Sequence, residues 1–97
     1  MQRSNSTINL SADEEHLINV MSLLGDETRF RIFKILQSGN EMCVSEIAAA
    51  LGVSVPAVSQ HFKIFELTGL VDKQRYGQKI CYQLKADDPI INNIISN

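Results

Sequence analysis

Residues 44–71, VSEIAAALGVSVPAVSQHFKIFELTGLV, predict two helices joined by a short turn. The apolar pattern of the first helix ends at Gly52, because glycine readily adopts the left-handed conformation that closes a helix. Ser54 is expected to cap the second helix through its hydroxyl, and Gly69 to end it. Two helices separated by so short a turn are typical of a helix-turn-helix, whose second helix enters the major groove of DNA.

The second helix has one apolar and one polar face. Val58, Phe62 and Phe65 recur at helical spacing, so their side chains are expected to face the core. The remainder of the helix supplies the candidate DNA contacts, which are Ser54, Ala57, Ser59, Gln60, His61 and Lys63. Hydroxyl and amide groups can bind base edges, whereas a lysine contacts phosphates. The alternative is an ordinary amphipathic helix with a solvated polar face.

The charge of the chain is unevenly distributed. The formal net charge of −2 by itself argues against a polyanionic partner. From residue 29 to residue 85, however, eight Lys and Arg stand against four Asp and Glu, whereas the flanks hold one basic residue and seven acids. The middle therefore carries +4 and the ends −6. A nucleic acid responds to the local field rather than to the total charge, so the middle remains a candidate for DNA binding.

A β-hairpin is predicted directly after the second helix. Residues 70–75 and 79–84 have the composition and alternation of two strands, joined by Tyr76-Gly77-Gln78. The candidate contacts on this hairpin are Lys73, Arg75, Gln78 and Lys79. A basic hairpin in this position is typical of a wing that lies on the DNA backbone or minor groove beside the recognition helix. A solvated hairpin whose lysines protect a sheet edge is the alternative.

Three further helices complete the expected fold. Ser11 and Glu14 form a capping box for a helix that Gly25 ends, Asp26 caps the next helix, and Asp88-Pro89 opens the last one. The fold class is therefore mainly α with a small β-hairpin. The architecture is a winged helix-turn-helix of five helices and a two-stranded wing, in the order α-α-α-α-β-β-α.

The expected domain organisation is a flexible tail at 1–10 and one winged helix-turn-helix domain at 11–97. The domain comprises the helix-turn-helix at 44–69, the wing at 70–85 and a dimerisation helix at 88–96. The last helix carries an apolar stripe of Ile90, Ile91, Ile94 and Ile95. A helix of about two turns is marginal alone, so this stripe must pack either on the chain's own core or on the first helix of a second copy, and we expect the second copy. A homodimer formed through the first and last helices also suits a two-fold operator.

Other protein classes leave signals that this sequence lacks. No apolar run approaches the roughly 18 residues of a membrane span, and the first ten residues have no signal-peptide core. We therefore expect a cytoplasmic protein with no membrane partner and no cofactor, in which the two cysteines are free thiols rather than a structural disulfide. There is no nucleophile–base pair at readable spacing and no Gly-rich phosphate loop, so an enzyme is not expected.

Several segments, taken in order, resemble the ArsR/SmtB family of winged-helix repressors. They are LGDETRFRI at 24–32, EMCVSEI at 41–47, VSQHF at 58–62, RYGQ at 75–78 and YQL at 82–84. The first differs from the family pattern at Glu27, where a proline is common. The second resembles the family's metal box, written ELCVCDL, and the third its recognition-helix pattern, VSxHL. The resemblance implies a homodimer that represses an operator and dissociates from it when an effector binds.

The family's metal sites are incomplete here. The metal box carries two cysteines, but this chain has Cys43 and then Ser45, and the tail adds no cysteine. The last helix lacks the histidine of the family's other site, so no metal site is predicted and the effector stays unknown. A redox or effector role for Cys43 and Cys81 is one hypothesis, because a thiol at a helix N-terminus is more reactive. The alternative is that both are small buried or half-buried apolar residues.

Together these patterns predict a dimeric regulator that binds a double-stranded DNA operator and acts as a repressor. A winged-helix module that binds a protein partner without specific DNA binding is the alternative, because a fold does not fix a function. The net charge of −2 favours this alternative.

Overall fold

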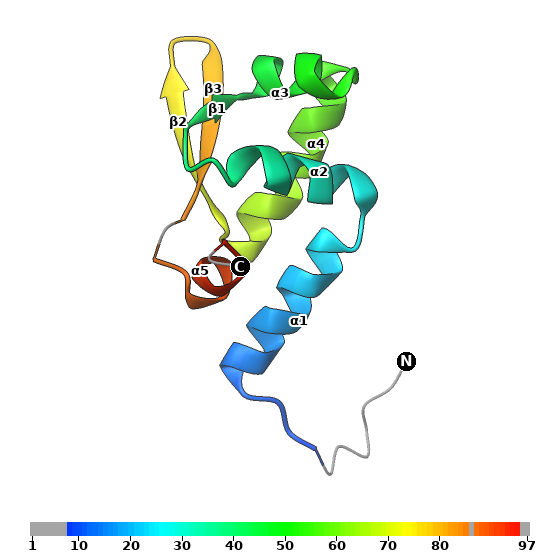
Figure 1. The fold of residues 1–97 in the computed structure, drawn as a ribbon, viewed down its shortest axis with the longest axis vertical. Helices are drawn as coiled ribbons and strands as arrows, with labels where there is room; N and C mark the ends of the chain where they lie inside the picture. Colours follow the sequence, from blue (N-terminus) through cyan, green and yellow to red (C-terminus); the bar gives the residue numbers. More distant parts are fainter. Residues whose placement is uncertain (1–7, 86, 96–97) are drawn as a thin grey trace.

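The computed structural model describes residues 8–85 and 87–95, and it contains five helices and three short strands within those ranges. Along the chain these are α1 (Ala12–Leu24), α2 (Glu27–Leu36), β1 (Met42–Cys43), α3 (Val44–Leu51), α4 (Val55–Thr68), β2 (Val71–Tyr76), β3 (Lys79–Leu84) and α5 (Pro89–Ile95). The expected winged helix-turn-helix is therefore confirmed. In Figure 1, α3, the start of α4 and the tip of the wing lie at one end, whereas the start of α1 lies at the other.

The sheet has three strands, in the order β1-β3-β2, and all its pairings are antiparallel. The expectation of a two-stranded wing was therefore incomplete. β1 is only two residues long, too short to show a period of its own, and its pairing partner lies almost forty residues later. Met42 pairs with Tyr82 and Cys43 with Cys81, which makes β3 the central strand.

This register also corrects the expectation of free thiols. Cys43 and Cys81 are Cα partners on adjacent strands, and a disulfide joins them across a sequence separation of 38. Cys81, on the central strand, is fully buried. Neither the pairing nor the bond can be read from a local pattern.

Local capping signals place the helices where the sequence predicts them. The Ser11 hydroxyl accepts a hydrogen bond from the Glu14 N–H at 3.1 Å, while the Ser11 N–H donates to Glu14 Oε1 at 2.9 Å. The Asp26 carboxylate accepts from the Arg29 N–H at 3.0 Å at the start of α2. Gly52 and Gly69 end α3 and α4 with φ angles of 70° and 73°, a conformation that a side chain would strain.

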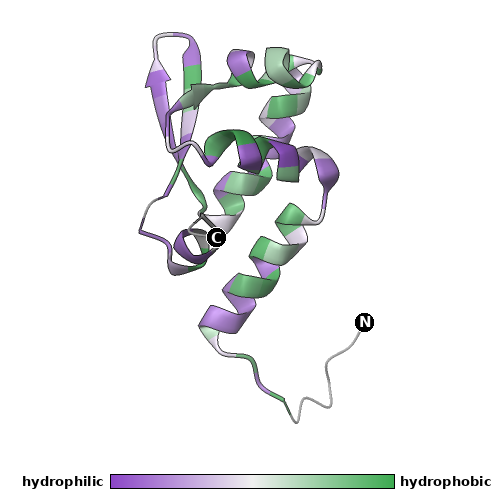
Figure 2. Ribbon diagram, viewed as in Figure 1, coloured by the Kyte–Doolittle hydropathy of each residue, from purple (hydrophilic) through white to green (hydrophobic). Residues whose placement is uncertain are grey.

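The core surrounds α4, which presents Val58, Phe62 and Phe65 fully buried, as expected. Phe62 stacks on Tyr82 of the central strand, with ring centroids 3.9 Å apart and planes inclined by 4°. The other buried members of the core come from α1, α2, α3 and the sheet with the residue before it, and include Val20, Leu23, Ile32, Phe33, Leu36, Val44, Ile47, Ala48, Leu70 and Leu84. Figure 2 shows hydrophobic residues interspersed with hydrophilic ones along α4 and α2.

The first helix keeps apolar surface outside this core, and it contacts the start of the last helix. Leu17 and Met21 of α1 remain 42% and 63% exposed, whereas Val20 on the same helix is buried. His16 connects α1 to the start of α5, because its Nε2 lies 2.9 Å from Asp88 Oδ2. Asp88 Oδ1 accepts from the Ile90 N–H at 2.9 Å and so caps α5.

Two sequence expectations fall partly outside the described residues. Residues 1–7 of the expected tail are not described, and neither are the side chains of Ile91, Ile94 and Ile95 from the expected apolar stripe. Ile90 is half-buried and packs against the core. Within the described part of the chain, no helix combines the length and apolarity needed to cross a bilayer.

Candidate nucleic-acid interface

The turn between α3 and α4 sets the direction of the recognition helix. The Gly52 N–H donates to the carbonyl groups of Ala48 and Ala49, and the Val53 N–H donates to the Ala48 carbonyl at 3.1 Å. Ser54 then caps α4, its hydroxyl accepting from the Ala57 N–H at 3.2 Å. The Ser54 hydroxyl is thus engaged in capping, and residue 57 is half-buried just inside the helix.

The outer face of α4 carries the polar residues that the sequence assigns to it. Gln60 and Lys63 are exposed, and Ser59 is half-buried beside them. These three residues are displaced around the helix from the fully buried Val58 and Phe62. These side chains are therefore accessible to solvent on this face of α4.

His61 lies closer to the helical body than Gln60 does. It is half-buried, and its charge acts on Asp26 at the start of α2. The hydrogen bond from the Arg29 N–H lowers the pKa of Asp26, and the charges of Arg29 and His61 lower it further. The Arg29 guanidinium donates from Nε to the Leu23 carbonyl at 2.8 Å, so this cation holds the end of α1.

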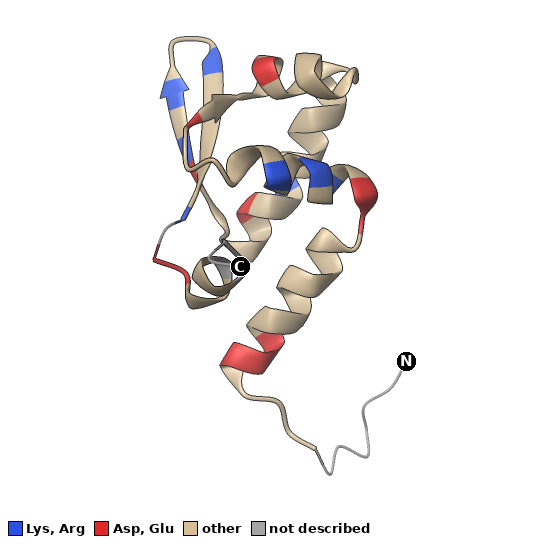
Figure 3. Cartoon of the chain, viewed as in Figure 1, with Lys and Arg blue, Asp and Glu red and all other residues tan. Residues whose placement is uncertain are grey.

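The basic residues of the wing are exposed. Lys73 and Arg75 lie on β2, Lys79 begins β3, and Gln78 lies in the two-residue turn with Gly77, whose φ is 63°. Lys73 Nζ lies 3.7 Å from Glu66 Oε2, an exposed pair of small energetic value. Figure 3 shows Lys and Arg on the wing and on α2, and Asp and Glu at the start of α1 and before α5 as well as at the start of α2 and on α3 and α4.

Two tyrosines attach the wing to the body. The buried Tyr82 donates a short hydrogen bond from its hydroxyl to Glu66 on α4. Burial of the ring and the neighbouring Glu66 carboxylate raise the pKa of Tyr82 well above its ordinary value. Nearer the tip, the Tyr76 hydroxyl donates to Glu41 Oε1 at 2.8 Å, and this hydrogen bond raises the pKa of Tyr76 as well. Neither contact could be predicted from the sequence, because each glutamate lies far along the chain from its tyrosine.

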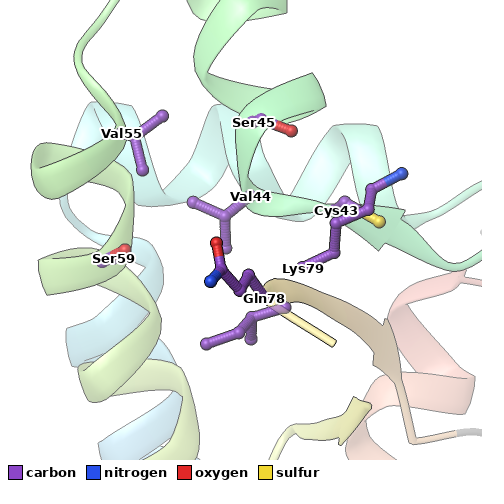
Figure 4. Close-up of a pocket in the computed structure, with 8 residues that line it drawn as sticks. Cys43, Val44, Ser45, Val55, Ser59, Gln78 and Lys79 are labelled. Atoms are coloured by element: carbon purple, nitrogen blue, oxygen red, sulfur yellow. The ribbon is translucent and has the colours of Figure 1, made fainter. Parts of the chain in front are cut away.

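A cleft of about 300 Å³ separates the recognition helix from the wing. Its walls come from β1 and the start of α3, the first turns of α4, and the start of β3 (Figure 4). The lining residues are Cys43, Val44, Ser45, Val55, Ser59, Gln78, Lys79 and Ile80. Three predicted contact residues, Ser59, Gln78 and Lys79, thus meet at one site. No local pattern in the sequence indicates the apolar wall, because its valines and isoleucine lie on three separate elements.

A metal centre is not formed by the residues described. Within 8–85 and 87–95, no group of three or more His, Cys, Asp or Glu side chains is arranged to hold an ion. His16 and Asp88 form a pair, and both cysteines are bonded to each other.

Comparison with known proteins places this geometry in a family. The family model described as bacterial regulatory protein, arsR family, matches residues 26–73, which include α2, the helix-turn-helix and the start of the wing. The arsenic resistance transcriptional regulator ArsR2 of Pseudomonas putida is 35% identical over 71 residues, which are 73% of this chain and 62% of the relative. A transcriptional repressor SmtB homolog of Synechocystis is 34% identical over 84 residues, 86% of this chain and 62% of the relative.

The fold has close structural counterparts. The structure of HlyU from Vibrio cholerae superposes with a TM-score of 0.79 at 24% identity, and the match covers 90% of this chain and 91% of that one. The chain spans about three-fifths of the length of the two relatives above. The family and these relatives are transcriptional regulators rather than enzymes. On its helix-turn-helix, its wing and its sequence similarity, this chain belongs to the ArsR family of bacterial regulatory proteins.

Proposed function

We propose that this protein is a sequence-specific DNA-binding transcriptional regulator that acts as a repressor. The observation that supports this most directly is the cleft between α4 and the wing, where Ser59, Gln78 and Lys79 meet beside the exposed face of the recognition helix. Family membership supports the same function. Binding to chromosomal DNA would place the protein in the cytoplasm.

The residues of α4 divide by their chemistry. Gln60 projects from the exposed face, and its amide can donate and accept on an adenine edge. Ser59 lies at the edge of the cleft and can bond to a base or a sugar. Ala57 offers an apolar contact to a thymine methyl group near the start of the helix.

Phosphate contacts would come from cations and from groups at the edges of this face. Lys63 on α4 and Lys73, Arg75 and Lys79 on the wing are exposed and can neutralise phosphates. Gln78 at the wing tip can bond to the backbone or minor groove. Ser54 and His61 are expected to contribute less to DNA binding. The Ser54 hydroxyl already caps α4, and His61 lies beside Asp26.

The test is a selection of duplexes from a random DNA library, followed by anisotropy titrations with the selected duplex and a scrambled one. Gln60→Ala should relax sequence choice, costing about 1 to 3 kcal/mol on the selected duplex and little on the scrambled one. Lys79→Ala should weaken both about equally and reduce the slope of log K against log salt by about one.

Lys34→Ala is the matched control, because Lys34 is an exposed cation on α2 outside the cleft and the wing. It should leave sequence choice unchanged. Equal losses on both duplexes for Gln60→Ala would contradict the base contact. If the wild type shows no sequence preference at all, the proposal fails and the protein-interaction module becomes the better description.

The proposed regulator is a homodimer formed through α1 and α5. Leu17, Ile18 and Met21 expose apolar surface along α1, and the His16–Asp88 contact holds the start of α5 against the same helix. Recognition of a two-fold operator needs two copies of α4 in successive major grooves. The division into a tail at 1–10 and a single domain at 11–97 belongs to the same proposal, and no effector is assigned.

A further inference from the structure

We propose that the Cys43–Cys81 pair is a redox-reversible brace that sets the affinity of the wing for DNA. The disulfide holds the wing tip in its DNA-binding position, and reduction by a low-molecular-weight thiol releases it. This inference rests on the proposed function, because it concerns regulation of the same interface.

The bond joins the two halves of that interface. Cys43 ends β1 and directly precedes the first residue of α3, and its N–H donates to Glu46 Oε1 at 2.8 Å. Cys81 lies on β3, two residues after Lys79, and is fully buried. The disulfide therefore fixes the start of the helix-turn-helix to the strand that begins with Lys79.

The wing is anchored unevenly along its length. Its base is held by the stack of Tyr82 on Phe62 and by the hydrogen bond of Tyr82 to Glu66. Farther out than Cys81, the described attachments are the half-buried Ile80 and the hydrogen bond from Tyr76 to Glu41, which is exposed to water. The ladder between β1 and β3 comprises two residue pairs, one of which is the cystine itself. Reduction therefore weakens the outer half of the wing much more than its base.

The position of the two sulfur atoms favours exchange at Cys43. Cys43 is half-buried and lines the cleft, whereas Cys81 is closed off from solvent. A thiolate RS⁻ entering the cleft attacks Cys43 Sγ, forms an RS–S bond to it and expels the Cys81 thiolate, which takes up a proton. A second RS⁻ attacks the outer sulfur, giving RSSR and the Cys43 thiolate, which also takes up a proton from solvent. The protein thus gains two electrons and two protons and a small disulfide is formed, and the reverse sequence with RSSR restores the bond.

The geometry indicates that the disulfide form binds DNA more tightly than the reduced form. In the disulfide form, Gln78 and Lys79 already lie around the cleft with Ser59. Binding in that form requires less ordering of the wing, and pre-organisation of a contact surface raises affinity. We therefore expect the reduced protein to bind the selected duplex roughly threefold to tenfold more weakly, a modest effect because the base of the wing stays anchored.

The experiment uses the full chain, the selected duplex and buffers set by mixtures of glutathione and glutathione disulfide. Alkylation followed by mass spectrometry reports the fraction of bonded cysteine at each ratio, and anisotropy reports the dissociation constant. Cys43→Ser is the main variant, since serine is a good helix N-cap and leaves the buried Cys81 in place. It should bind like the reduced wild type at every ratio. Tyr76→Phe, which removes the remaining hydrogen bond near the tip, should widen the gap between the two redox states.

Three outcomes would overturn the inference. The first is equal affinity of the bonded and reduced wild type while selectivity for the duplex persists. The second is a Cys43→Ser variant whose affinity still follows the glutathione ratio. The third is a pair that alkylates completely at every ratio. A loss of selectivity in both redox states, with the pair still titrating, would instead refute the proposed function and with it this regulation.

Discussion

Removal of the Cys43–Cys81 bond should lower the free energy of unfolding of the whole domain. The size of this decrease depends on the length of chain between the two cysteines. The bond closes a loop with a sequence separation of 38. In the chain-entropy description, a loop of this length restricts the unfolded chain by about 13 cal/mol/K, which corresponds to about 4 kcal/mol at 25 °C. Measured values for native bonds start at about 2 kcal/mol, so the expected loss lies between these figures.

This loss is large for a chain of 97 residues. Small domains have unfolding free energies of about 5 to 15 kcal/mol, so the bond contributes a substantial fraction of the total. The assay is urea unfolding followed by circular dichroism, in the absence and presence of a non-thiol reductant such as a phosphine. With a slope of about 1 to 2 kcal/mol per M, the midpoint should fall by about 1 to 4 M on reduction.

The matched control is the double variant Cys43→Ser and Cys81→Ala, which cannot form the bond. Its midpoint should lie near that of the reduced wild type and should not respond to the reductant. A wild-type midpoint that is the same in both conditions, while mass spectrometry shows complete bond formation without reductant, would refute the loop-closure argument.

Two further predictions concern pH and assembly. Burial and the Glu66 carboxylate raise the pKa of Tyr82, so the contribution of this tyrosine to the free energy of unfolding is complete below pH 10. It is lost as the pH rises above about 10, by up to about 1.4 kcal/mol per pH unit. Tyr82→Phe should remove this part of the decrease in stability at alkaline pH, and equal decreases in the two proteins would contradict the prediction. Met21→Glu on the exposed face of α1 should convert the proposed dimer to a monomer in sedimentation equilibrium. Val53→Glu is the control, because it places the same charge at another exposed apolar residue, in the turn after α3, and should leave the dimer intact. An unchanged dimer in Met21→Glu would show that the interface lies elsewhere.

The helix-turn-helix was predictable because its boundaries depend on local chemistry. Ser54 caps α4 with its own hydroxyl, and Gly52 and Gly69 provide the left-handed conformations that end the two helices. Each of these signals acts within about four residues. The faces of α4 were predictable for a related reason, since the spacing of Val58, Phe62 and Phe65 assigns the buried side directly.

The features that could not be predicted from the sequence all depend on contacts between residues that lie far apart in the chain. β1 is defined only by its partner on β3, and Cys43 reaches Cys81 only through that register. Tyr82 and Glu66 likewise meet because α4 packs under the sheet. A single sequence contains no periodicity that links such positions, so the third strand, the disulfide and the anchoring of the wing appear only in the three-dimensional arrangement.

The direct succession of β1 and α3 constrains how the length of this chain can vary. Cys43 is the last residue of a strand and Val44 the first residue of a helix, with no spacer between them. An inserted residue would either turn α3 by about 100° about its axis or slip β1 by one position and reverse its faces. An insertion in the turn at Gly77-Gln78 would neither rotate a helix nor shift the pairing of β1. Among relatives of this protein, length changes should therefore accumulate at the wing tip and be absent from the strand-to-helix junction.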